Sequence, residues 1–202
     1  MTRTLAVDPA APASEAIREA AAVLRAGGLV AFPTESFYGL GADALNPAAV
    51  ARVFQVKGRP ASKPLLVLVD SVKMVEALSP EISDGARELM ARHWPGPLTV
   101  VLLAARELSP TLTAGTGTIG VRMPGHLPAL ALVREAGVPV TAPSANPSGA
   151  PPPSTARAVR RYFAGRIDLL LDGGATAGGA GSTIVDCRTW PPRLLRPGPV
   201  TI

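Results

Sequence analysis

Short apolar runs of strand length alternate along this chain with longer segments whose apolar residues recur at helical spacing. Leu65 to Val69 is an unbroken apolar run, which is typical of a strand covered on both faces. Residues 14 to 26 instead carry an apolar stripe between a candidate cap, Ser14, and the helix-ending pair Gly27-Gly28. This alternation predicts an α/β fold in which helices flank a twisted mixed sheet.

The same pattern extends over the whole chain without a repeat or a linker, so we expect residues 1–202 to form a single domain. Asn46 followed by Pro47 is typical of a helix start, and Pro151-Pro152-Pro153 predicts a rigid loop leading to a cap at Ser154. Strands are expected at 29–32, 65–69, 98–103, 119–122, 138–141, 167–171 and 183–186, and helices at 14–26, 46–56, 71–77, 81–92, 127–135 and 155–163.

Composition narrows the class of protein. With 47% hydrophobic and 17% charged residues the chain is typical of a globular protein, and its net charge of +5 favours phosphate-bearing partners. A single cysteine, Cys187, excludes an internal disulfide and a cysteine-built zinc site, and with only His93 and His126 a metal would need oxygen ligands. No signal peptide and no membrane-spanning run is apparent, so we expect a cytoplasmic protein without a membrane partner.

Several common catalytic motifs can be dismissed. Gly115 to Gly120 matches G-x-G-x-x-G, but the residues that follow indicate a strand, and Pro124 comes too soon for the helix that a dinucleotide site requires. The chain has no P-loop pattern, and Ser144 lacks the glycines of a nucleophile elbow.

Loops rich in hydroxyl groups and cations remain as candidates. Residues 33 to 41 follow a strand directly, as ligand-binding loops of α/β sheets do, although a turn with capping hydroxyls explains them equally well. Lys57-Gly58-Arg59-Pro60, with Lys63 nearby, has the charges to hold a polyphosphate; the alternative is a solvated helix end.

A third loop, 141 to 149, places Ser144 and Asn146 on one side of an extended segment, where an Asn-Pro turn is the competing explanation. Arg122 ends a strand and suits a carboxylate, and Ser182 and Arg196 each lie at the edge of an apolar strand. Trp94-Pro95-Gly96-Pro97-Leu98-Thr99 is more typical of a structural turn.

Taken in order, these motifs resemble the YrdC-like family of threonylcarbamoyl-AMP synthases. The resemblance runs from about Gly28 to Gly198 and rests on Pro-Thr-Glu-x-x-Tyr-Gly-Leu-Gly, Lys-x-Arg-Pro, Trp-Pro-Gly-Pro-Leu-Thr, Arg-x-Pro, Ser-Ala-Asn-x-Ser-Gly, Ser-Thr-x-x-Asp and Arg-Pro-Gly. It implies the YrdC-like fold around a basic concave cavity, in the short single-domain form of the family.

The resemblance also implies roles for particular residues. It makes Lys57, Arg59, Ser144 and Asn146 the signature polar set, with Lys63, Thr118 and Arg196 on the ATP side as well. It places Ser36, Arg122 and Ser182 on the threonine side, with Arg122 on the carboxylate. Two positions depart from the family pattern: Ser36 replaces a commoner threonine, and Leu68 replaces a histidine, which removes a polar contact to the amino acid.

The implied reaction joins L-threonine, bicarbonate and ATP into threonylcarbamoyl-AMP with release of pyrophosphate, the activity of a nucleotidyltransferase that supplies tRNA threonylcarbamoylation. It needs aligned reactants and fixed cations rather than a covalent nucleophile. Mg²⁺ is expected to arrive with ATP, and no protein metal site is expected. The product is expected to pass to a downstream threonylcarbamoyl transferase complex.

Two other functions are compatible with parts of the sequence. A non-catalytic module that binds tRNA or double-stranded RNA would use the basic surface, including Arg157, Arg160, Arg161 and Arg166. A carbamoyl-phosphate-dependent maturation domain is disfavoured, because such domains lie in longer chains with zinc-finger cysteines.

Overall fold

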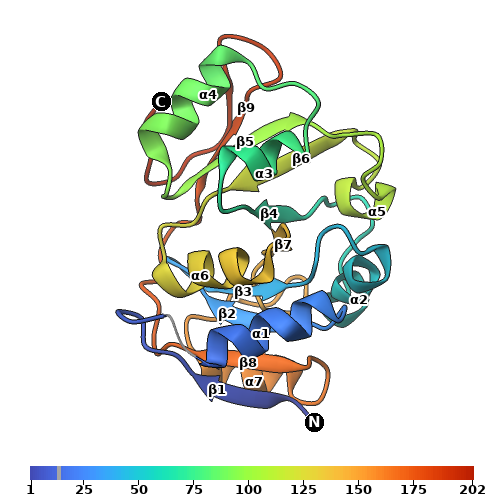
Figure 1. Ribbon diagram of the computed structural model, residues 1–202, viewed down its shortest axis with the longest axis vertical. Helices are drawn as coiled ribbons and strands as arrows, with labels where there is room; N and C mark the ends of the chain where they lie inside the picture. The colour runs from blue at the N-terminus through green and yellow to red at the C-terminus, as the bar shows by residue number, and fades with distance from the viewer. Residues whose placement is uncertain (13–14) are drawn as a thin grey trace.

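Two twisted sheets, one above the other along the long axis of the molecule, form the framework of the computed structural model (Figure 1). The structure describes residues 1–12 and 15–202, so the expected cap Ser14 lies outside the described residues. The four-stranded sheet has the order β1-β8-β2-β3, and the six-stranded sheet has the order β10-β9-β5-β6-β4-β7. The strands are β1 (Arg3–Ala6), β2 (Val30–Pro33), β3 (Tyr38–Gly41), β4 (Leu66–Leu68), β5 (Leu98–Leu103), β6 (Thr118–Arg122), β7 (Val140–Thr141), β8 (Leu169–Asp172), β9 (Thr183–Asp186) and β10 (Arg193–Arg196).

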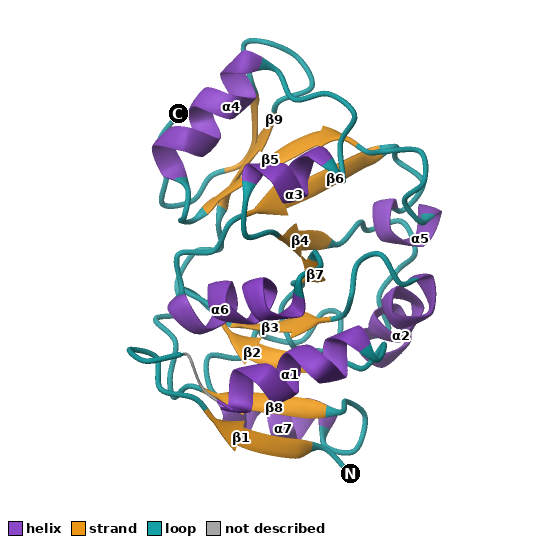
Figure 2. Ribbon diagram, in the orientation of Figure 1, coloured by secondary structure: helices purple, strands orange, loops and turns teal. Residues whose placement is uncertain are grey.

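Helices cover both faces of the four-stranded sheet: α1 and α6 lie on one face and α7 on the other (Figure 2). One face of α1 is buried, as the helical spacing predicted; it consists of Ile17, Ala20, Ala21 and Leu24. The helices are α1 (Glu15–Arg25), α2 (Pro47–Lys57), α3 (Val72–Glu76), α4 (Asp84–His93), α5 (Pro110–Thr113), α6 (Leu127–Ala136) and α7 (Ala156–Phe163). Within the described residues, none of these helices has the length and apolar content that crossing a bilayer requires.

The predicted mixed α/β fold is confirmed, but the strands divide between two sheets rather than one. The isolated bridges Gly39–Ser144 and Asp43–Val140 join the β3 region to the β7 region, with backbone hydrogen bonds such as that from the Thr141 N–H to the Ala42 carbonyl (2.9 Å). Pro139 and Pro143 flank β7, and proline has no N–H with which to continue a ladder. The sheets therefore meet along a short, interrupted seam.

Local signals predicted most elements well. β5 and β9 have the expected bounds, and the Asn46 side chain caps α2 by accepting hydrogen bonds from the backbone N–H groups of Ala48 and Ala49. The predicted cap at Ser154 is wrong: Thr155 caps α7, while the Ser154 carbonyl accepts a hydrogen bond from the Thr176 N–H.

The sequence did not predict β3, because its two glycines indicated a loop. The hairpin with β2 needs those glycines: a Cβ on Gly41 would lie 2.8 Å from the Phe32 ring, and one on Gly39 would lie 3.3 Å from it. β1, β10 and α5 were also missed. All three are four residues long, and β10 is exposed along its whole length, so they carry little apolar pattern.

Candidate functional site

A cavity of about 570 Å³ opens between the β2–β3 hairpin and the six-stranded sheet. Its lining comes from distant parts of the chain, and none of the described lining residues is acidic. The polar lining residues are Thr34, Ser36, Arg59, Thr99, Thr118, Arg122, Ser144, Ser182 and Arg196. The predicted basic concave cavity therefore exists, with three arginines on its wall.

Lys57, the last residue of α2, lies behind this wall and is only 3% exposed. Its ammonium donates hydrogen bonds to the backbone carbonyls of Ser144 (2.5 Å) and Asn146 (2.6 Å). It does not line the cavity. Neither interpretation of Lys57 from the sequence matches this geometry, because the ammonium holds the 144–146 loop instead of a phosphate or solvent.

Burial shifts the protonation equilibrium of this side chain. Desolvation, with a smaller contribution from the nearby Arg59 cation, lowers the pKa of Lys57 from its usual 10.5 to about 8. At neutral pH the ammonium still carries its charge in most molecules. Its charge-assisted bonds to carbonyls make it a strong tie between α2 and the loop after β7.

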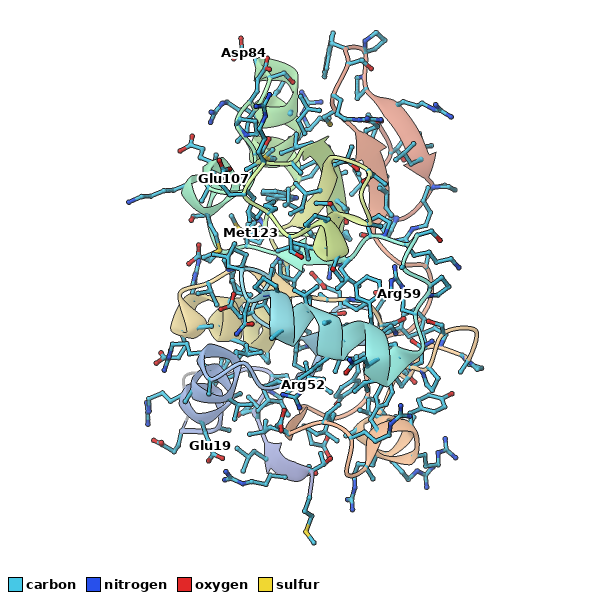
Figure 3. The ribbon with its side chains drawn as sticks, turned by 90° about the vertical axis from the view of Figure 1, so that its right-hand side faces the viewer. Glu19, Arg52, Arg59, Asp84, Glu107 and Met123 are labelled. Carbon is cyan, nitrogen blue, oxygen red and sulfur yellow. The ribbon has the colours of Figure 1, made fainter. Side chains whose placement is uncertain are left out.

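Arg59 follows the αL cap residue Gly58, which ends α2 and redirects the chain toward the cavity. Figure 3 shows Arg59 beyond the end of α2, at the level where the two sheets meet. Its guanidinium donates to the carbonyls of Lys63 (2.9 Å) and Pro64 (2.8 Å) and also lines the cavity. Lys63 itself is exposed and outside the lining, so its carbonyl rather than its ammonium belongs to the site.

The serine and the asparagine of the Ser-Ala-Asn motif have different roles. Ser144 lines the cavity, whereas Asn146 is buried, and its side-chain amide donates to the carbonyls of Pro147 (3.0 Å) and Ala150 (2.7 Å). The Asn-Pro turn and the ligand-facing serine, which the sequence presented as alternatives, occur together. Asn146 shapes the loop that carries Ser144.

Arg122, at the end of β6, is 4% exposed and reaches the cavity wall. Its Nη2 lies 3.5 Å from Oε2 of Glu35, whose other oxygen accepts a hydrogen bond from the Gly125 N–H. Burial lowers the pKa of Arg122, and the Glu35 carboxylate opposes that shift. Arg122 thus presents a cation to the cavity that a single carboxylate only partly balances.

Ser36 lies at the tip of the β2–β3 hairpin and lines the same cavity. Its carbonyl accepts hydrogen bonds from the Thr176 hydroxyl (2.7 Å) and the Gly178 N–H (2.8 Å), which attach the glycine-rich segment before β9. Leu68 is fully buried, in the core cluster that also holds side chains of α1 and α6, and does not line the cavity. The effect of Leu68 on threonine binding stays a prediction.

Ser182 and Arg196 meet on the opposite wall. Arg196 donates through Nε and Nη2 to the Ser182 carbonyl (3.1 and 2.7 Å) and through Nη2 to the Ser182 hydroxyl (3.2 Å). Burial lowers the pKa of Arg196. The Ser182 hydroxyl lies 2.7 Å from that of Thr99.

The structure brings together Ser36, Arg59, Thr118, Arg122, Ser144, Ser182 and Arg196 of the predicted set, and leaves Lys57, Lys63 and Asn146 off the lining. Thr34, Phe37 and Tyr38 of the candidate loop 33 to 41 also line the cavity without an individual prediction, and sequence reasoning missed Thr99. Thr99 ends the motif that the sequence assigned to a structural turn. The structural part is confirmed at Trp94, whose indole donates to the Leu98 carbonyl (2.7 Å), but Thr99 faces the cavity.

Comparison with known proteins gives consistent matches. The Sua5/YciO/YrdC family model, described as telomere recombination, matches residues 22–198. Threonylcarbamoyl-AMP synthases from Pyrococcus abyssi and Bacillus subtilis are 49% and 47% identical to this chain over 90% and 92% of its length. The crystal structure of P. abyssi Sua5 complexed with L-threonine superposes with a TM-score of 0.92 at 46% identity and covers 98% of this chain. The chain spans only 54% of the length of each of these two relatives and 58% of that solved chain.

We predict that Lys57→Met lowers the free energy of unfolding by about 2 kcal/mol, because two buried carbonyls lose their donor. Urea unfolding would measure the loss. Lys63→Met is the matched control: this lysine is exposed, and its replacement should change stability by less than about 0.5 kcal/mol. Equal stability of the two variants would show that the buried ammonium holds nothing in place.

The stability that depends on Lys57 should also change with pH. Because its pKa falls from 10.5 to about 8 on folding, the folded protein binds fewer protons than the unfolded chain between these values. Stability contributed by Lys57 therefore rises with pH across this window. The difference in unfolding free energy between wild type and Lys57→Met should grow by about 2 kcal/mol from roughly pH 7 to roughly pH 9.5. A constant or shrinking difference would contradict the assignment.

Proposed function

The chain belongs to the Sua5/YciO/YrdC family, and on that premise we propose that it is a transferase-type enzyme, a nucleotidyltransferase that makes threonylcarbamoyl-AMP. Its substrates are L-threonine, bicarbonate and ATP, and its second product is pyrophosphate. The observation that carries the proposal is that both predicted halves of the site line one cavity: Arg59, Thr118, Ser144 and Arg196 for ATP, and Ser36, Arg122 and Ser182 for threonine.

The chemistry matches what the cavity offers. The threonine amine adds to carbon dioxide or bicarbonate to form a carbamate, and a carbamate oxygen then attacks the α-phosphorus of ATP and expels pyrophosphate. Neither step needs a covalent enzyme intermediate. Both need two anionic reactants held close together and the charge that develops on the phosphates neutralised.

The residues divide the work by charge. Arg122 suits the threonine carboxylate, because its buried guanidinium is only partly balanced by Glu35. Arg59 and Arg196 suit the phosphates from two sides of the cavity. Lys57 does not contact the substrates but holds the loop that presents Ser144.

Mg²⁺ enters as part of the MgATP substrate, coordinated by phosphate oxygens and water. Among the described residues there is no group of three or more His, Cys, Asp or Glu side chains placed to hold a metal ion.

The alternative function, an RNA-binding module without catalysis, has one observation in its favour. Arg157, Arg160 and Arg161 are exposed on α7, and no acidic side chain pairs with them within the described part of the chain. Such a surface would suit the phosphate backbone of tRNA or double-stranded RNA. We propose that this arginine surface binds RNA as an accessory to catalysis, in the cytoplasm and near the transferase complex that consumes the product.

The decisive experiment is a pyrophosphate-release assay with purified protein, ATP and Mg²⁺. We expect release only when threonine and bicarbonate are both present, because the carbamate is the nucleophile. Release that ignores threonine would reject the proposal. RNA binding without any release would favour the alternative.

We further predict that Arg59→Ala lowers pyrophosphate release by at least about 100-fold, since it removes a fixed cation from the phosphate side. Its melting temperature should stay within a few degrees of wild type, because the guanidinium bonds are peripheral to the core. Arg134→Ala, on the exposed face of α6, is the control and should retain full activity. An unfolded Arg59→Ala protein would mean that this arginine is structural.

A further inference from the structure

We propose that Thr99 is a positioning residue, which directs the hydroxyl proton of Ser182 into the cavity toward the carboxylate of bound threonine. This inference rests on the proposed function and adds a residue that the expected site did not contain. It starts from the hydroxyl pair at the junction of β5 and β9.

The two hydroxyls meet in a buried place. Thr99 on β5 is 2% exposed, and Ser182, immediately before β9, is 4% exposed. The strands are parallel neighbours, with Leu98 opposite Thr183, so their pairing brings the two side chains together. Their oxygens lie 2.7 Å apart, a normal distance between hydroxyl groups, and both residues line the cavity.

Either hydroxyl of this pair can be the donor, and the proposed direction, from Thr99 to Ser182, is the one that leaves the Ser182 proton for the cavity. A serine hydroxyl has two acceptor positions and one donor, whereas a guanidinium only donates. Arg196 Nη2, 3.2 Å away, occupies one acceptor position of Ser182. Ser182 is the only partner that the described residues give the Thr99 hydroxyl, and in the proposed direction Thr99 donates to the second acceptor position of Ser182. The Ser182 proton is then free to point into the cavity.

That arrangement fits a carboxylate on the ligand. A hydroxyl that accepts two hydrogen bonds, one of them from a cation, is a better donor to a third group. Arg122 lines the same cavity and supplies the charge for the same carboxylate. Without the Thr99 hydroxyl, Ser182 keeps only Arg196 as a donor and can rotate its proton away.

The packing role of Thr99 can be separated from its hydroxyl. A Cβ on Gly120 would lie 3.5 Å from the Thr99 methyl, which packs over that glycine of the neighbouring β6. Thr99→Val keeps this methyl and the β-branched shape suited to a strand. Thr99→Ser keeps the hydroxyl and loses the methyl, so the two variants divide hydrogen bonding from packing.

The test measures the KM of the wild type and both variants for threonine and for ATP in the pyrophosphate assay. Thr99→Val should raise the threonine KM about tenfold, the effect of one neutral hydrogen bond, and change the ATP KM by less than about twofold. Thr99→Ser should stay within about twofold of wild type for both substrates. A purely structural role would instead affect both substrates, or Thr99→Ser as strongly as Thr99→Val.

A double-mutant cycle with Ser182→Ala tests whether Thr99 acts through the Ser182 hydroxyl. In that background Thr99→Val should cause no further loss of threonine affinity, measured by calorimetry where turnover is too slow. An unchanged threonine KM in Thr99→Val, or an equal loss with and without the Ser182 hydroxyl, would overturn the inference while leaving the proposed function intact. Wild-type protein that releases no threonine-dependent pyrophosphate would overturn both.

Discussion

The buried ammonium of Lys57 is the contact on which the arrangement of the site depends. It joins the end of α2 to the loop after β7 through two short bonds to backbone carbonyls. An ammonium can satisfy both carbonyls at once, and its pKa of about 8 keeps it charged at neutral pH. Because this tie fixes the 144–146 loop, Ser144 faces the cavity and Asn146 turns inward.

The seam between the sheets explains why a cavity forms at this place. Prolines on both sides of β7 remove two N–H donors from its pairing with the β3 region, so the two sheets share backbone hydrogen bonds there without one continuous ladder. The hairpin that carries Ser36 then faces the strands that carry Thr99, Thr118 and Arg122 across an open space. Glu35 crosses that seam to the Gly125 N–H and to Arg122, so the same contact links the sheets and balances a site cation.

Sequence reasoning located the polar loops but not the direction of every side chain. Arg59 and Ser144 could be anticipated because they follow a helix end and a strand, and Ser182 because it lies at the edge of an apolar strand. Whether a lysine at a helix end faces solvent, a phosphate or a carbonyl depends on the loop that packs over it, which is a tertiary property. The role of Thr99 was not predicted because its strand is otherwise apolar. Strand β3 was not predicted because glycine has little strand propensity.

The cavity holds more positive charge than the protein itself neutralises. Burial lowers the pKa values of Arg59, Arg122 and Arg196, which reflects the cost of keeping guanidinium groups away from water. Glu35 offsets that cost only at Arg122. A ligand that brings phosphates to one side and a carboxylate to the other supplies the missing countercharges. Binding such a ligand relieves a penalty already present in the folded protein, so affinity for anions and stability of the fold are linked through the same three arginines.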